Sequence, residues 1–415
     1  MCIVMMMDYC IHINNKVIIF LWFLFIISCT SERNGGTLVK NLSTIEATTD
    51  LVIGIPDQPL EYQLGRPIAV RTDAEGHIYI ADRASREIKV FDHDGTYLRS
   101  IGGRGRGPGE FEDFEFMEMS PEGHLVLMDR GNMRYTVISR EGEEVGSYPY
   151  NMSDPFYPQS ITYTDEQILA LFYNSSSRLE IPEFERDLFH LYSTDFQQRK
   201  TSFMPVEQLG YDNWYLVNAM GIHPGSFTLS EDDTILIFSP CTYTGLLYKF
   251  MKENDGLWTF DRTIQGTTPG IDPYQIYASE SQFLSAMDSE IARAGQVSDA
   301  NGTHWGSQFS MDAGIYSLKD GRMVHFYAEW KEDYKRLPGS MSHPMDLYVQ
   351  VFDPSGELTH HSFLFTYIEQ FVVPFFSVVN WMDENGNFYM LDHPDEIPVV
   401  RRFSLDFPGV GKSEK

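Results

Sequence analysis

An internal repeat is the strongest constraint on how this chain can fold. Residues 75–83 (EGHIYIADR) and residues 122–130 (EGHLVLMDR) align without a gap at an offset of 47 residues. The register continues downstream in a valine pair and a glycine pair: Val90 with Val137, and Gly95 with Gly142. A fixed period of about 40–50 residues indicates an array in which each repeat is one supersecondary unit. The repeat therefore constrains the architecture more tightly than the chemistry.

The composition favours strands and argues against nucleic acid as a partner. Aromatic residues make up 14% of the 415 residues, and the repeats are rich in Tyr, Phe, Ile and Val, which suit strands. With 31 basic against 59 acidic residues, the formal net charge is −28. Because such a surface repels phosphate backbones, we expect no nucleic-acid partner. We interpret the acidity chiefly as a source of solubility.

Residues 1–28 have the features of an export signal, which is set aside from the fold. Lys16 precedes an apolar run over 17–27, which is too short to span a bilayer because about 20 residues are needed. The run leads through Ser28 to Cys29, a pattern that resembles the lipobox of bacterial lipoproteins. An ordinary signal peptide that contains a cysteine is the alternative. The Gly- and Ser-containing segment that follows favours a lipidated Cys29 and a flexible tether over 29–43.

Cysteine usage agrees with an exported protein that has no internal disulfide. Cys2 and Cys10 lie in the leader and Cys29 would carry lipid, so Cys241 remains alone. A large apolar core must then hold the fold. We expect Cys241 to be a small buried apolar group rather than a nucleophile.

Each repeat predicts short strands separated by Asp-Gly type turns. The strands of the first two repeats are expected over 68–71, 77–81, 88–91 and 97–101, and over 116–119, 124–128, 135–138 and 144–148. Later repeats show strand pairs at 168–172 and 188–192, 234–238 and 246–250, 321–327 and 347–352, and 383–392 and 399–405. The last repeat lacks a fourth strand, which the apolar run 51–55 can supply, and such closure removes exposed sheet edges. The expected fold is an all-β, six-bladed β-propeller over 44–408 with a tail over 409–415; seven blades is the alternative.

Residues 129–137 (DRGNMRYTV) resemble the NHL-repeat signature, in which Asp, Asn and Arg mark the loop before the third strand. The glycine-rich run 102–111 is similar to the connection between NHL blades. Together with the lipobox, the chain resembles six-bladed β-propeller lipoproteins of Bacteroidetes, by specific residues over 66–150 and by pattern thereafter. The first repeat departs from the signature, with Ser85 and Glu87 where Asn and Arg would stand. The resemblance implies the fold and a lipid anchor at the cell envelope, in the outer membrane. It leaves open whether the protein faces the periplasm or the cell surface, and it assigns no catalytic residue.

Two arginines and two aspartates recur at equivalent positions after the second strands. Asp82 and Asp129 are expected to fix the following loop by accepting backbone N–H bonds. Arg83 and Arg130 follow them directly. They either solve the same packing problem in each blade or form part of an arginine ring around the channel mouth, where they would bind a ligand.

The glycine-rich connection carries two further candidate ligand-binding residues, Arg104 and Arg106. In a very acidic protein these cations can meet a carboxylate or sulfate group, or form salt bridges to neighbouring blades. A phosphate-binding loop is excluded, because Pro108 stands where the third glycine of the dinucleotide-binding motif would be and no Gly-Lys-Ser/Thr ending follows.

Three insertions interrupt the later repeats, at 279–294, 331–343 and 201–220. The first is expected to form a helix, because Phe283, Leu284, Met287 and Ile291 share one helical face. Insertions in repeat folds often map to one binding face, although each could equally cover a channel end. Their aromatic residues are candidate ligand contacts: Trp214, Tyr215 and Trp330.

Motifs for catalysis and metal binding are missing from the sequence, and we expect no catalytic residue, metal or cofactor. His360 and His361 are adjacent, so on a strand they point to opposite faces. Residues 383–387 lack the distal Glu of a calcium loop, and no nucleophile elbow occurs. We favour a membrane-tethered, non-catalytic propeller that binds an envelope protein, a glycan or a peptide. The alternative is a propeller-type hydrolase or lyase with a divalent metal in the central channel.

Overall fold

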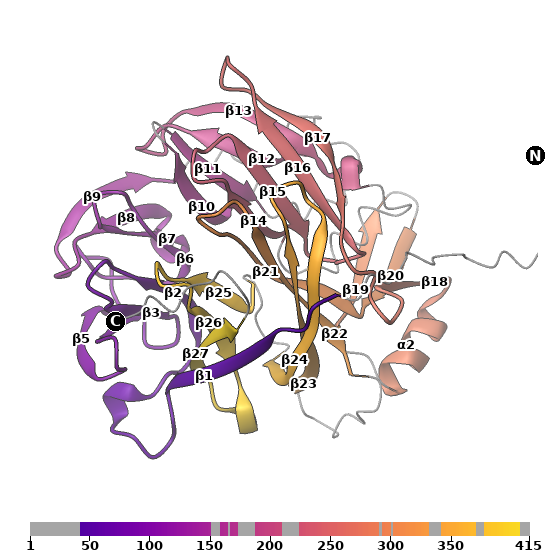
Figure 1. The fold of residues 1–415 in the computed structure, drawn as a ribbon. Coiled ribbons are helices and arrows are strands. Elements are labelled where there is room, and N and C mark those ends of the chain that lie inside the picture. Colours follow the sequence, from indigo (N-terminus) through magenta and orange to yellow (C-terminus); the bar gives the residue numbers. More distant parts are fainter. Residues whose placement is uncertain are drawn as a thin grey trace, which may run out of the picture. The chain divides into compact units, whose positions relative to one another are not determined.

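The computed structural model describes residues 42–150, 158–164, 167–172, 187–209, 224–289, 293–299, 302–331, 342–370 and 377–406. Six four-stranded antiparallel sheets stand around a central axis, as the ribbon shows (Figure 1). The expected six-bladed β-propeller is confirmed, and the seven-bladed alternative is wrong. The expected leader and most of the tether, including Cys29, lie outside the described residues.

The blades follow each other in sequence, and each runs from an inner to an outer strand. Blade one comprises β2 (Pro67–Thr72), β3 (Ile78–Asp82), β4 (Glu87–Phe91) and β5 (Tyr97–Gly102). Blade two comprises β6 (Phe114–Met119), β7 (Leu125–Asp129), β8 (Arg134–Ile138) and β9 (Glu144–Pro149). Blade three comprises β10 (Pro158–Thr164), β11 (Gln167–Phe172), β12 (Asp187–Tyr192) and β13 (Arg199–Pro205).

The remaining blades repeat the plan. Blade four comprises β14 (Gly225–Leu229), β15 (Ile235–Pro240), β16 (Leu246–Lys252) and β17 (Trp258–Gln265). Blade five comprises β21 (Ser310–Ser317), β22 (Met323–Trp330), β23 (Ser342–Phe352) and β24 (Leu358–Gln370). Blade six comprises β25 (Val379–Met382), β26 (Phe388–Asp392) and β27 (Val399–Asp406), with β1 (Glu46–Ile53) as its outer strand.

The N-terminal strand closes the ring, as the sequence predicted. β1 pairs antiparallel with β27, from Glu46 opposite Asp406 to Ile53 opposite Val400. The strand is longer than the predicted run 51–55 on its N-terminal side, because polar residues there also join the ladder. Blade six therefore has no unpaired outer edge at β27, which is how a closed ring avoids edge-to-edge association.

Packing between neighbouring blades explains the hydrophobic pattern of the second strands. Ile78 and Ile80 of β3 pack in the cluster shared with blade six, whereas Tyr79 and Ala81 pack in the cluster shared with blade two. A strand covered on both faces reads as a continuous apolar run rather than an alternating one. All five residues of β3 are buried for this reason.

The two ends of the propeller differ in their connections. At one end, here called the hairpin face, short turns join the first strand of a blade to the second and the third to the fourth, as at 73–77 and 383–387. β1 begins and β27 ends at this face. At the other end, the insertion face, longer segments leave and return, as at 206–224 and 266–309. All three predicted insertions fall between strand ends of the insertion face.

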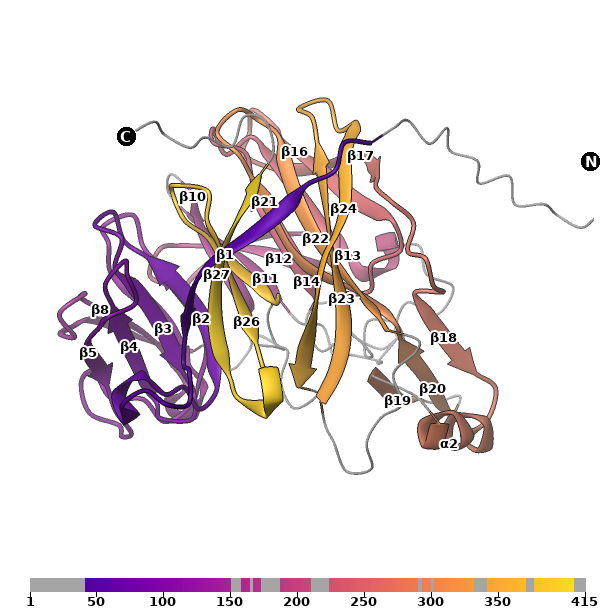
Figure 2. The same ribbon diagram turned by 60° about the horizontal axis from the view of Figure 1, so that its bottom comes forward.

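The segment between blades four and five differs from the expected single helix. It forms β18 (Tyr274–Tyr277), α2 (Glu280–Ser289), β19 (Arg293–Asp299) and β20 (Gly302–Gln308), and the strands make a three-stranded sheet in the order β18-β20-β19. Figure 2 shows this unit at the end of the propeller away from the start of β1. The helix is shorter than predicted, and the strands were missed because β19 and β20 are polar and lack an apolar alternation.

Two further details of the insertions correct the prediction. Phe283 of α2 is buried against Tyr277, but Leu284 is 52% exposed. Only part of the predicted apolar face of the helix therefore packs against the rest of the protein. The first residues of the predicted insertion 201–220 instead complete the fourth strand of blade three, β13. The segment 331–343 does join two strands of blade five, as predicted.

Candidate functional site

The repeated aspartates fix the loops that follow them, as expected: the backbone N–H of Ala84 donates to Asp82 at 3.1 Å, and that of Asn132 donates to Asp129 at 3.3 Å. They also hold the segments that precede the first strands. The Asp82 carboxylate accepts hydrogen bonds from the backbone N–H groups of Gly65 (2.8 Å) and Arg66 (2.7 Å). The Asp129 carboxylate accepts one from the backbone N–H of Asp113 at 3.1 Å. Each aspartate therefore ties the end of a second strand to the segment that enters the first strand of the same blade.

The NHL-like residues hold the glycine-rich connection in place. Asn132 donates from its side-chain amide to the carbonyl of Gly105 at 3.0 Å. Arg134 donates to the carbonyls of Gly107 (3.0 Å) and Glu110 (3.1 Å). These signature residues serve the junction between blades one and two, and their role here is structural.

Of the two arginines on that connection, one is paired and one is free. Arg104 is 69% exposed and reaches Glu112 at 3.3 Å, so it forms a salt bridge within the same connection rather than the predicted one to a neighbouring blade. Arg106 is exposed, and its side chain has no ion-pair partner among the described residues. Neither reaches the channel cavity described below.

Arg83 and Arg130 converge on a single carboxylate at the insertion face. Glu115, at the start of β6, is 4% exposed and receives Arg83 at 3.2 Å and Arg130 at 2.9 Å. Arg83 also forms a bidentate pair with Asp113, at 2.5 and 2.6 Å. Arg83 thus bridges blades one and two, because Asp113 and Glu115 belong to the next blade along the ring, whereas Arg130 pairs with Glu115 within blade two.

Arg66 completes this arginine cluster (Arg66, Arg83 and Arg130). It directly precedes β2. Burial, followed by the charge of Arg83, lowers the pKa of Arg66, while Asp113 and Glu115 oppose this effect. Sequence reasoning missed Arg66, because the equivalent position in the next repeat holds an acidic residue, Asp113.

A cavity of about 540 Å³ occupies the central channel. Its described lining includes a polar pair: Arg71 contacts both oxygens of Glu118 (3.0 and 2.8 Å) and lies 4.7 Å from the centre of the Trp381 ring. Glu115 lines the same cavity. The first strand of every blade contributes to the wall, with Ala69, Met117, Ile161, Phe227, Ile315 and Val379.

A buried polar network joins blades four, five and six. His325 on β22 is fully buried, and its Nε2 lies 2.8 Å from Ser239 Oγ and 3.2 Å from Asp312 Oδ1. Gln350 donates from Nε2 to His325 Nδ1 at 2.7 Å, and its Oε1 accepts from the backbone N–H of Thr267, which orients the amide. Sequence reasoning missed this Ser–His–Asp set, because its members lie on three different strands.

The network does not have the geometry of a hydrolytic triad. Because Gln350 donates to Nδ1, the proton of the neutral imidazole is on Nε2, where Ser239 and Asp312 share it. A triad needs the opposite arrangement, in which the serine donates to one ring nitrogen and the aspartate accepts from the other. Ser239, His325 and Asp312 are also all 0% exposed, so the set has a structural role.

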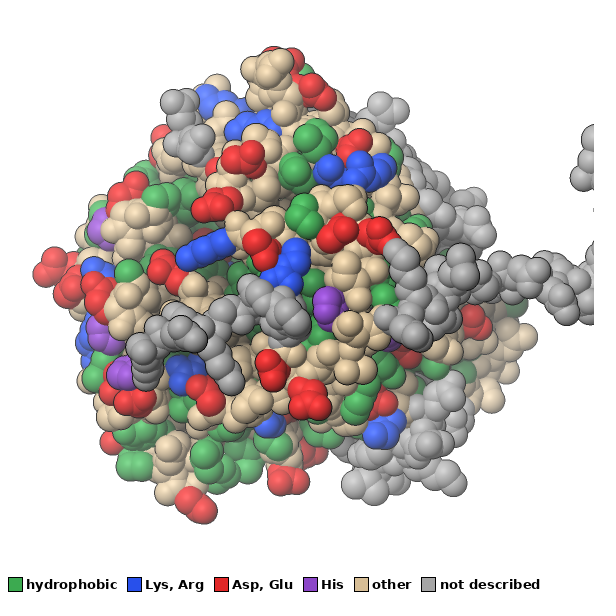
Figure 3. Space-filling model, in the orientation of Figure 1, with side chains coloured by type: hydrophobic (Ala, Val, Ile, Leu, Met, Phe, Trp, Pro, Cys, Tyr) green, Lys and Arg blue, Asp and Glu red, His purple; other side chains and the backbone are tan. Residues whose placement is uncertain are grey.

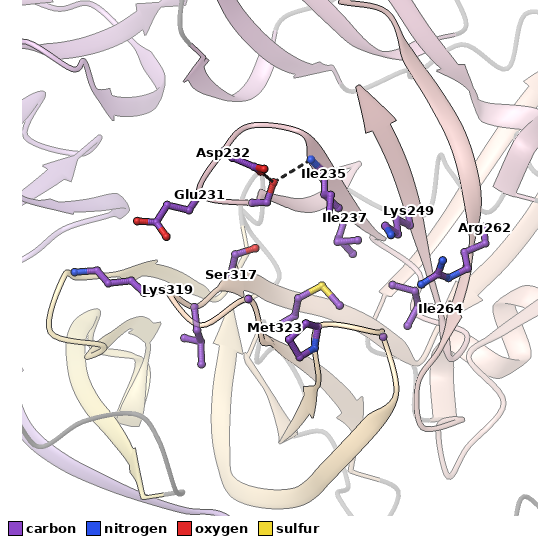
Figure 4. A pocket seen from close by; sticks show the side chains of 15 residues that line it. Glu231, Asp232, Ile235, Ile237, Lys249, Arg262, Ile264, Ser317, Lys319 and Met323 are labelled. Atoms are coloured by element: carbon purple, nitrogen blue, oxygen red, sulfur yellow. Dashed lines mark hydrogen bonds between the residues drawn. The ribbon is translucent and has the colours of Figure 1, made fainter. Parts of the chain in front are cut away.

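A groove of about 480 Å³ lies between blades four and five at the hairpin face. Figure 4 shows its apolar floor and its charged walls (Figure 4). Lys249 and Arg262 on one wall share one carboxylate, Asp261, at 3.3 and 3.1 Å. Ile235, Ile237, Ile264 and Met323 provide apolar surface. The groove suits an apolar group more than an ion.

One set of potential metal ligands occurs among the described residues, in the first hairpin of blade one: Asp73, Glu75 and His77. Arg140 from blade two enters it, at 3.3 Å from Asp73 and 2.6 Å from Glu75. Hydrogen bonds from His77 and Tyr79 further lower the pKa of Asp73, against the opposing effect of burial. The Arg140 guanidinium already contacts both carboxylates and offsets one of their two negative charges, so the set is a poor cation site.

The predicted aromatic contacts have mixed outcomes. Trp330 is only 6% exposed and belongs to the core between blades five and six, which argues against a role on an exposed rim. Trp214 and Tyr215 lie outside the described residues. Cys241 is free and buried, as expected. No described helix is long and apolar enough to cross a membrane.

Comparison with known proteins agrees with the fold. A family model described as a 6-bladed beta-propeller (DUF5128) matches residues 61–211. No protein of curated function matches the chain. Among solved structures, a member of the DUF4221 family from Bacteroides vulgatus is similar with a TM-score of 0.53 and 12% identity, covering 88% of this chain and 99% of that one.

Two weaker structural likenesses carry no argument about function. A Bacteroides fragilis protein, provisionally described as exported, has a TM-score of 0.47 and 12% identity, covering 89% of this chain and 98% of its own. Virginiamycin B lyase from Staphylococcus aureus has a TM-score of 0.40 and 9% identity, covering 87% and 99%. By its own topology and by the matching family model, the chain is a six-bladed β-propeller.

Proposed function

We propose that the protein is a membrane-anchored, non-catalytic binding propeller of the bacterial cell envelope, whose ligand or partner docks on the insertion face. The observation that carries this proposal is the segregation of the connections. The hairpin face has only tight turns, whereas the segments 173–186, 206–224, 266–309 and 331–341 all join strand ends of the insertion face. Loops held by a rigid scaffold are where binding residues concentrate.

The channel chemistry supports binding over catalysis. A metal-dependent hydrolase or lyase needs several His, Asp or Glu side chains converging on one point. The described lining has no histidine and four acidic residues. Glu115 is bound by Arg83 and Arg130 and Glu118 by Arg71, whereas Glu231 and Asp233 belong to the turn 230–234 at the hairpin face. Paired carboxylates hold a fixed shape and charge pattern, which suits recognition of a ligand.

The position of the N-terminal strand supports an anchor that leaves the insertion face accessible. β1 begins at the hairpin face, so the chain enters the propeller from that face. Figure 3 shows acidic side chains scattered over this side of the molecule, with Lys and Arg side chains between them (Figure 3). An acidic face is repelled by anionic lipid headgroups, so the anchor rather than the surface would hold the protein to the membrane.

The anchor is tested by Cys29→Ala. Several acyl chains, at about 0.8 kcal/mol for each buried CH₂, hold a protein firmly on a bilayer, so the variant should move from the membrane fraction to the soluble fraction. Cys10→Ala is the matched control, because this cysteine lies in the leader, and it should fractionate like the native chain. Unchanged fractionation of Cys29→Ala would refute the anchor.

The binding face is tested with photo-crosslinking groups at exposed acidic positions. Asp272 and Asp395 lie at the insertion face, and Asp94 and Glu384 at the hairpin face. In intact cells, crosslinks to an envelope component should form from Asp272 or Asp395 and not from the other pair. Crosslinks confined to the hairpin face would contradict the proposal.

A further inference from the structure

The arginine cluster at the insertion face carries one positive charge more than its carboxylates neutralise. Arg83 and Arg130 are paired with Asp113 and Glu115. Arg66 makes no ion pair with any described residue, and its Nε is buried without a hydrogen-bond partner. The Arg66 side chain as a whole is partly buried, and a buried N–H group of a guanidinium that lacks a partner is costly. Here it occurs in a chain whose net charge is −28.

The repeat explains why the partner is missing. Arg66 in blade one and Asp113 in blade two occupy equivalent positions. Each directly precedes the first strand of its blade. Arg83, after the second strand of blade one, crosses the junction to bind Asp113. The residue that follows the second strand of blade six is His393. The equivalent pairing between blades six and one would therefore join Arg66 to a histidine, and neither group is an anion.

The electrostatics around Arg66 favour an incoming negative charge. Arg83 acts on Arg66 as a like charge, and burial together with this charge lowers the pKa of Arg66. Burial also lowers the pKa of His393. Glu115, which Arg83 and Arg130 bind, lines the central cavity, so the cluster lies at its insertion-face end. A planar guanidinium in such a place matches the geometry of a carboxylate or sulfate group.

We propose that Arg66 binds an oxyanion, a carboxylate or sulfate group of the ligand, at the insertion-face end of the channel. Arg83 and Arg130 supply the surrounding positive potential, and their own carboxylate partners keep them from closing over the site. The inference rests on the proposed function in taking the insertion face as the binding face. It narrows the ligand to a molecule with an acidic group, such as an acidic glycan or a peptide carboxylate.

The test measures the melting temperature of the purified mature chain in sodium sulfate, and separately in sodium glucuronate, against sodium chloride at equal ionic strength. Sulfate stabilises proteins in general through exclusion from their surface, but a bound ion adds a saturable part. We expect saturable stabilisation of the native chain, lost in Arg66→Gln and retained in Arg106→Gln. Arg106 is the matched control, because it is an exposed arginine without a described partner.

The outcomes separate the possibilities. An Arg66→Gln chain that keeps the saturable response, or an Arg106→Gln chain that loses it equally, overturns the site. The melting temperature of Arg66→Gln in chloride checks that the variant folds. It should be equal to or higher than that of the native chain, because a like-charge contact with Arg83 is removed. Arg66→Lys should recover part of the saturable stabilisation by the anion. A response to glucuronate but not to sulfate identifies a carboxylate ligand. Crosslinks at the insertion face with no anion effect would remove this inference and leave the proposed function standing.

Discussion

The junction between blades one and two and the junction between blades four and five hold neighbouring sheets together by different chemistry. The first uses ion pairs, in which the buried Glu115 meets Arg83 and Arg130, and Arg130 reaches solvent with 44% of its side chain exposed. The second uses hydrogen bonds around His325 and Gln350, both 0% exposed. The charged junction lies in the regular repeats, whereas the buried network lies where the repeats diverge.

The difference shows how the free-energy cost of losing a polar contact depends on its exposure to solvent. A partly exposed ion pair can exchange its partner for water, so its loss is modest and depends on salt. A buried polar network cannot, because each unsatisfied member keeps the full desolvation penalty. Blades four and five should therefore be more sensitive to single substitutions than blades one and two.

Removing the closing strand should reduce the stability most, and it should destabilise both junctions together. Deletion of residues 44–58 removes β1 and exposes the edge of β27. We expect a loss of at least about 5 kcal/mol in the free energy of unfolding, comparable with the whole stability of a small domain, and loss of hydrogen-exchange protection at both junctions together. Deletion of 409–415 is the control. A truncated chain that melts like the mature protein would contradict a closed ring.

Breaking the buried network should come next in size. His325→Leu leaves Ser239, Asp312 and Gln350 without a common partner, and we expect a loss of about 3–4 kcal/mol. Denaturant unfolding measures it, and because the site is shielded the loss should be the same in low and high salt. A loss below about 1 kcal/mol would show that the network is replaceable by apolar packing.

Blade three, between the two junctions, should make the stability depend on pH. Burial lowers the pKa of His190 from 6.5 to about 4, so the unfolded chain binds a proton more readily than the folded chain between these values. Its contribution to stability is present above about pH 6.5 and falls as the pH drops toward 4, by up to about 3 kcal/mol. His190→Phe should reduce the dependence of the unfolding free energy on pH. Part of the dependence should remain, because burial also lowers the pKa values of His361 and His393. An unchanged slope would show that His190 stays neutral in both states.

Neutralising the charged junction should have the smallest effect. Glu115→Gln removes the shared carboxylate, but Arg83 keeps Asp113, and Arg130, with 44% of its side chain exposed, can turn to water. We expect a loss of about 1–2 kcal/mol, reduced further in 1 M salt. A loss as large as that of His325→Leu, or one independent of salt, would remove the distinction between the junctions.

Much of the fold was predictable because it depends on local chemistry and on period. The 47-residue offset places the strands and hairpins of blades one and two, and the missing fourth strand of the last repeat pointed to β1. The polar strands β19 and β20 were not predicted, because without apolar alternation a short strand has no sequence signal. Leu284 was predicted to lie on a packed apolar face of the helix but is exposed. A helix that packs on one side only can leave part of its apolar face in solvent.

The candidate site divides along the same line. The sequence by itself determined the six-bladed ring, its closure, the loop-fixing roles of Asp82 and Asp129, and the placing of the insertions between strands. Only the tertiary structure decided that Trp330 is buried and that Ser239, His325 and Asp312 meet. It also decided that Arg66 lies near Arg83 without an ion-pair partner among the described residues. The physical reason is that a period specifies contacts within a repeat. Contacts between blades depend on which side chains from distant segments are brought to the same junction, and on whether their charges balance there.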